Sequence, residues 1–161
     1  MTPDEIHQLK IAEAQRAHDN ETEFGREANK AAVNSGAEAL KALLYLNGGS
    51  CVIMLAFIGA LASKTDKPVA NFAVPLVYFA LGAGLAVLAN AAGYFTNLMI
   101  TGTSNRKERV YEHPFLLDTP SSKRQRCWGE RFRFTAIILA FAALGCFFVG
   151  LYFAYGAFKH V

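Results

Sequence analysis

The chain has 161 residues, 53% of them hydrophobic, and a formal net charge of +3. This length leaves room for one domain, and the mean hydropathy of +0.21 favours a membrane protein over a soluble one. Charge falls in three blocks, residues 1–41, 64–67 and 106–133. The uncharged stretches, each long enough to cross a bilayer, are Ala42–Ser63, Pro68–Asn105 and Phe134–Phe158. We therefore expect an all-α integral membrane protein with three transmembrane helices.

The N-terminal block, residues 1–41, has the composition of a polar helix. Thr2-Pro3-Asp4-Glu5 is a strong helix start, with an N-cap, a proline in the first turn and a glutamate that can complete a capping box. Glutamates followed three residues later by a base, and many alanines, favour a continued helix. No break separates this block from the first span, about 42–63, so we expect one continuous or nearly continuous helix.

The central stretch from Pro68 to Asn105 has no ionisable residue. As a helix it would be about 57 Å long, too long for a soluble core helix, whereas two spans of about 20 residues and a turn would need more residues. We expect one span, about 72–100, that begins near Asn71 or Pro75 and follows a tight turn at Lys64–Pro68. Small residues recur along it, a pattern that lets helices pack closely in lipid. We assign helix packing to Gly82, Ala86, Ala89 and Gly93.

The third span is expected at about 134–158, after a basic loop at 101–133 that Pro114 and Thr119-Pro120 keep from being one helix. Its small residues recur every four positions, which predicts a second packing stripe. This stripe consists of Ala142, Cys146, Gly150 and Ala154.

Lys and Arg set the expected orientation. The N-terminal block and the 101–133 loop hold thirteen of the sixteen basic residues, and the positive-inside rule places both in the cytoplasm and the C-terminus outside. No N-terminal signal peptide is visible, so the first span is expected to act as the insertion signal.

The basic loop ends in bases mixed with an aromatic residue immediately before a span. Such residues contact anionic lipid headgroups or an anionic partner, and their place beside the bilayer disfavours nucleic acid. The residues are Lys123, Arg124, Arg126, Trp128, Arg131 and Arg133.

Three asparagines lie within the spans: Asn47, Asn90 and Asn97. An amide in hydrocarbon is costly unless it is paired, so these side chains either bond between helices or line a polar path. Around Asn47, the sequence Asn47-Gly48-Gly49-Ser50 is open to two interpretations, a kink or pore position and close packing against a neighbour.

No motif for catalysis, a cofactor or a metal is present, and no charge lies within a span, which disfavours proton relays and ion-coupled transport. The one candidate for acid or base chemistry is His113, beside Glu112 and near Arg109. Without a nucleophile or phosphate loop near it, we predict a protein that is not an enzyme.

The run Gly36–Gly59, with Leu46-Asn47-Gly48-Gly49 as its most specific part, resembles short bacterial inner-membrane proteins of unknown function. The layout is also similar to small membrane effectors of antiphage systems, which oligomerise and perturb the membrane. The first likeness implies this topology and a bacterial inner membrane as the location, without an activity. Because two small-residue stripes and three asparagines need packing partners, we expect a homo-oligomer with a pore or scaffold role, whose cytoplasmic helix and basic loop bind a partner. The alternatives are an accessory subunit of a larger membrane complex and a membrane-bound enzyme that uses His113.

Overall fold

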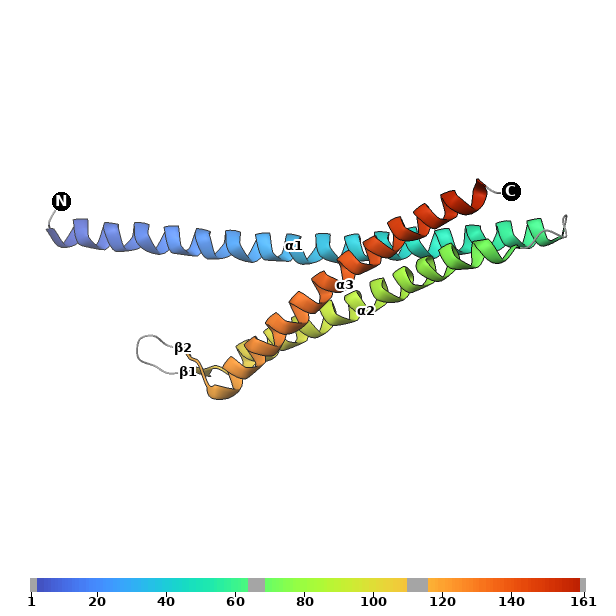
Figure 1. The fold of residues 1–161 in the computed structure, drawn as a ribbon. Coiled ribbons are helices and arrows are strands. Elements are labelled where there is room, and N and C mark those ends of the chain that lie inside the picture. Colours follow the sequence, from blue (N-terminus) through green and yellow to red (C-terminus); the bar gives the residue numbers. More distant parts are fainter. Residues whose placement is uncertain (1–2, 64–68, 110–115, 160–161) are drawn as a thin grey trace. The chain divides into compact units, whose positions relative to one another are not determined.

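The computed structural model describes residues 3–63, 69–109 and 116–159. Three long helices dominate them, α1 (Pro3–Ala62), α2 (Ala73–Asn105) and α3 (Pro120–Phe158). A 3-10 turn, η1 (Val69–Phe72), precedes α2 (Figure 1). Strands β1 (Glu108–Arg109) and β2 (Leu116–Leu117) form a two-residue antiparallel ladder between α2 and α3. The turn expected at 64–68 lies outside the described residues.

Three helical segments are long and apolar enough to cross a membrane, Arg26–Ala62, Ala73–Thr103 and Pro120–Phe158. The expected all-α fold with three candidate spans and a long first helix is therefore confirmed. The chain divides into two compact units, Met1–Glu38 and Ala39–Val161. In the first unit, the described side chains of α1 are exposed except for the half-buried Ala37, as the polar sequence of this segment predicts.

The second and third helices are longer than expected, and the loop between them is shorter. We expected a loop at 101–133, but α2 continues to Asn105 and α3 already begins at Pro120. The physical reason is that Thr119-Pro120 starts a helix instead of interrupting one, because proline is favoured in a first turn. Pro75 is likewise accommodated, since it lies in the first turn of α2.

Thr119 ties the start of α3 to the end of α2. Its Oγ1 accepts a hydrogen bond from the Ser122 backbone N–H at 3.1 Å, which satisfies one of the free N–H groups of the first turn. The same hydroxyl donates to the Arg106 carbonyl oxygen at 2.8 Å. One side chain therefore caps α3 and closes the connection.

Loss of this hydroxyl should loosen the first turn of α3. For Thr119→Val we expect a cost of about 1 kcal/mol, seen as about fivefold faster amide hydrogen exchange at Ser122 and Lys123. Thr135→Val is the matched control, because the Thr135 hydroxyl bonds only to Arg131 O in its own helix, at 2.9 Å. Equal exchange in both variants would show that Thr119 is not the cap that holds this turn.

α2 and α3 lie side by side and run antiparallel (Figure 1). Gly129 of α3 lies against Met99, and Gly150 lies against Phe79, which fixes their register. The contact face of α2 follows a heptad repeat of buried or half-buried residues: Pro75, Phe79, Gly82, Ala86, Ala89, Gly93 and Thr96. The opposing face of α3 has a small, buried or half-buried residue at every seventh position: Ser122, Gly129, Ala136, Ala143, Gly150 and Ala157. Heptad spacing and small side chains give close packing of the coiled-coil type.

Aromatic clusters mark the two ends of this membrane unit. At one end Phe57, Phe72 and Phe158 meet edge to face, with ring centroids 4.9 to 5.3 Å apart. At the other, Trp128 and Phe132 have ring centroids 6.1 Å apart. Trp128 and Phe158 are about 45 Å apart along α3, close to the full thickness of a bilayer with its headgroups. The rings thus lie where interfacial aromatic belts are found.

Candidate functional site

The C-terminal half of α1 packs onto α2 and α3 through a buried cluster and one buried amide. Met54 belongs to a core cluster with Phe72, Phe79 and Ala154. Asn47 is completely buried, with a relative exposure of 0%. A fully buried polar side chain in a membrane protein must find its hydrogen-bond partners within the fold.

Asn47 connects all three helices. Its Nδ2 donates to Leu43 O in α1 at 3.0 Å and to Ala143 O in α3 at 3.3 Å. Its Oδ1 has no hydrogen-bond partner among the described residues and lies against Gly82 of α2, in the place where a Cβ would be. A Gly82 Cα–H therefore points at Oδ1, the kind of weak C–H···O contact that recurs between closely packed helices.

Of the two interpretations of Asn47-Gly48-Gly49-Ser50, the structure places Asn47 in close packing. α1 continues without a break through this run. The close contact falls on Asn47 and on Gly82 opposite it, while Gly48 and Gly49 have open space around them. Asn47 therefore lines no polar path inside this unit.

The other two asparagines, Asn90 and Asn97, are exposed on the outside of α2. Around them lies a strip that we call the outer face of α2. Its small or polar exposed residues are Ala80, Gly84, Asn90, Ala91 and Asn97, and it also carries Val87 and, toward Asn97, the larger exposed side chains of Tyr94 and Leu98. α2 thus carries two stripes of small residues. The inner stripe packs on α3 and α1, and the outer one is exposed along its length.

Asn90 and Asn97 lie at different depths. The contacts of Gly129 with Met99 and of Gly150 with Phe79 place Asn97 level with about Arg131, among the charges of α3. The same register places Asn90 level with about Ile138, roughly 7 Å further into the uncharged stretch than Arg133. At the depth of Asn97, water and headgroups can hydrogen-bond the amide, so its exposure costs little free energy. At the depth of Asn90, an exposed amide faces hydrocarbon and has an unfavourable free energy unless another group bonds to it.

The packing stripes predicted from the sequence are placed in part at the helix contacts. Gly82, Ala86 and Ala89 are buried and Gly93 is half-buried. In α3, Gly150 and Ala154 are buried and Cys146 is half-buried, but Ala142 is exposed and its neighbour Ala143 is buried instead. Ala142 falls outside the contact because two helices that pack along their whole length touch at sevenfold spacing, which selects Ala143, Gly150 and Ala157. The heptad in α2 was the signal that could have shown this.

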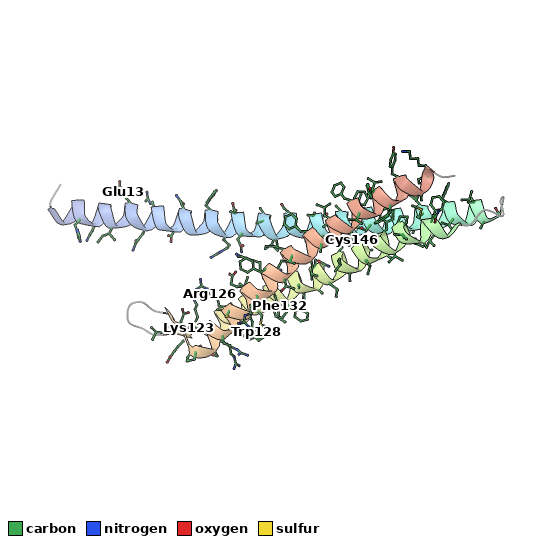
Figure 2. All side chains as sticks on the ribbon, in the orientation of Figure 1. Glu13, Lys123, Arg126, Trp128, Phe132 and Cys146 are labelled. Atoms are coloured by element: carbon green, nitrogen blue, oxygen red, sulfur yellow. The ribbon has the colours of Figure 1, made fainter. Side chains whose placement is uncertain are left out.

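The predicted lipid-contact residues gather at the start of α3, beside the hairpin (Figure 2). All six of them are exposed. Arg131 lies over the Trp128 ring at 5.3 Å from its centroid, a cation–π contact, and Arg133 pairs with Glu130 at 3.3 Å. Because they belong to a helix and not a loop, these side chains project in defined directions. We call this region, the last turn of α2 with the first turns of α3, the basic end.

The described residues contain no group of three His, Cys, Asp or Glu side chains that could hold a metal ion. Glu112 and His113, the candidate pair for acid or base chemistry, lie outside the described residues. Comparison with protein-family models finds no match to this chain. Searches of curated protein sequences and of solved structures also find no match.

Proposed function

We propose that this protein is a non-enzymatic membrane protein that assembles with copies of itself through the outer face of α2. The observation that carries this proposal is the exposed Asn90 amide, level with the uncharged part of α3. In this proposal the N-terminal helix and the basic end lie in the cytoplasm, because residues 1–41 and 106–133 hold thirteen of the sixteen bases. There they receive a partner protein or signal.

A second copy is the occupant that suits this face best. An asparagine amide is both donor and acceptor, so the same residue from a symmetry-related copy can satisfy it. Ala80, Gly84 and Ala91 around it have the small side chains that allow backbones to approach in lipid. In a closed ring the repeated Asn90 side chains form a polar band, the feature on which a pore role for the assembly depends.

Gly84→Leu tests the assembly without disturbing the three-helix unit, because a Cβ at Gly84 meets nothing within 4 Å. We expect the full chain in mild detergent to run as a discrete homo-oligomer, and Gly84→Leu to weaken self-association at least tenfold by holding the helices apart. Native mass spectrometry would measure both. Gly145→Leu is the control, since Gly145 also has open space but lies on α3.

The outcomes separate this proposal from its rival. A wild-type chain that stays monomeric, or a Gly84→Leu variant that assembles normally, contradicts self-assembly through this face. Stoichiometric copurification of other membrane proteins that Gly84→Leu abolishes would show an accessory subunit that uses the same surface. A role as a membrane effector in antiphage defence further requires that the assembly permeabilise the membrane, which growth inhibition on expression would report.

A further inference from the structure

The basic end contains a groove that the proposed assembly does not use. It has a volume of about 870 Å³ and lies between the last two turns of α2, the first turns of α3, and Lys107 and Asp118 beside the β1–β2 ladder. Its polar wall includes Lys123, Arg126 and Arg131, and its apolar wall includes Ile100 and Phe134. The groove is thus lined by cationic side chains on one part of its wall and by hydrophobic side chains on another.

The groove carries a net positive charge. Four bases line it, Lys107, Lys123, Arg126 and Arg131, with two acids, Asp118 and Glu130, which leaves +2. Both acids already have a cation beside them, because Lys107 lies 3.8 Å from Asp118 and Arg133 lies 3.3 Å from Glu130. Lys123 and Arg126 form no ion pair within the described parts of the chain. Both side chains are exposed, so they are available to an anion from outside the unit.

The position of the groove indicates what kind of anion this is. Phe134 is the first residue of the uncharged stretch of α3, and Arg131 lies about 4.5 Å above it along the helix axis. Trp128, half-exposed on the same turns, has the side chain that prefers headgroup depth. The apolar wall therefore faces the edge of the hydrocarbon while the cations lie at the level of phosphates.

We propose that this groove binds one anionic phospholipid, with its phosphodiester held by Arg126 and Arg131 and an acyl chain against Ile100 and Phe134. Guanidinium groups suit this role because they bind phosphate oxygens in pairs. Lys123, one to two turns further from the membrane, contacts the outer part of the headgroup. This is a discrete site with fixed stoichiometry, in contrast to a general attraction between basic residues and a charged leaflet.

Two variants with the same loss of charge test the site. Arg126 lines the groove, whereas Arg124 is equally exposed, two residues away and outside it. With the full chain in mild non-ionic detergent, we expect native mass spectrometry to show one phosphatidylglycerol per chain, bound about tenfold more tightly than phosphatidylcholine with the same acyl chains. Arg126→Gln should reduce this preference about fivefold or more, and Arg124→Gln by less than twofold.

A conservative variant, a melting-temperature comparison and competition with inorganic phosphate complete the test. Arg126→Lys should recover part of the preference, and all variants should melt at the same temperature without added lipid, which separates binding from folding. Excess inorganic phosphate should not displace the lipid, because the acyl contacts hold it. An equal effect of Arg124→Gln and Arg126→Gln, no preference over phosphatidylcholine, or displacement by inorganic phosphate would each overturn the proposed site. The lipid groove and the outer face of α2 are separate surfaces, so loss of lipid binding should not change self-assembly. A result that contradicts one proposal therefore leaves the other standing.

Discussion

Replacement of Gly82 by leucine is expected to break the packing of the three-helix unit, at a cost of about 3 kcal/mol in its free energy of unfolding. A Cβ at Gly82 would lie 2.6 Å from Asn47 Cγ, well inside van der Waals contact. Asn47 cannot move aside cheaply, because it is completely buried and its Nδ2 bonds to Leu43 O and Ala143 O. The added side chain must therefore separate α2 from α1 or expel the amide.

The single tryptophan reports this unfolding. Trp128 contacts Phe132, and Phe132 stacks on Phe95 of α2 with ring centroids 5.5 Å apart, so Trp128 fluorescence should change when α2 and α3 separate. Titration with sodium dodecyl sulfate from a mild detergent would give the unfolding midpoint. Gly145→Leu, made where nothing lies within 4 Å, should change stability by no more than about 0.5 kcal/mol. Equal midpoints for the Gly82 and Gly145 variants would contradict the packing described.

A double-mutant cycle identifies the partner in this contact. Gly82→Ala should be destabilising by itself because its methyl group overlaps Asn47. In the background of Asn47→Ala, which leaves a space at that position, the same change should cost markedly less. Additive effects would show that Asn47 and Gly82 do not interact, since only residues in contact couple strongly.

Hydropathy and charge predicted the parts of this fold that they control. Three uncharged stretches defined three candidate spans, because the bilayer sets a length that a helix must match. Pro3 and Pro75 each lie in a first turn, as the tolerance of proline at that position requires. These are local properties of the chain, and no knowledge of neighbouring helices is needed to infer them.

Tertiary packing could not be predicted in the same way. Ala142 and Ala143 are equally small, and only the heptad contact with α2 decides that Ala143 is buried. Thr119-Pro120 suits a turn or a helix start, and in the structure it starts a helix, with Thr119 as the cap for Ser122 N–H and also bonded to Arg106 O. Asn47 and Asn90 are the same residue in similar sequence surroundings, yet one is buried within the unit and the other is exposed.

Because Asn90 is exposed and Asn47 is buried, a substitution at Asn90 can test self-assembly without disturbing the three-helix unit. Asn90→Leu should insert and fold normally, since the side chain is exposed in the three-helix unit and leucine is better suited to lipid. Interhelical hydrogen bonds in membranes contribute about 0.6 and at most about 1.7 kcal/mol. Removal of Asn90 should therefore weaken each contact between copies about 3- to 20-fold. A ring with one such contact per copy loses this factor at every interface, so the oligomer should dissociate at working concentrations.

Asn97→Leu is the matched control, because it removes the same amide from the same face, about one heptad nearer the charges of α3. Water and headgroups can satisfy Asn97 at that depth, so we expect less than a twofold effect on assembly. Sedimentation in mild detergent would compare the oligomers, and planar-bilayer recording or growth inhibition would compare their activity. Full activity of Asn90→Leu would remove this residue from any polar path. Equal losses in both variants would show that depth in the membrane does not decide which amide the assembly needs.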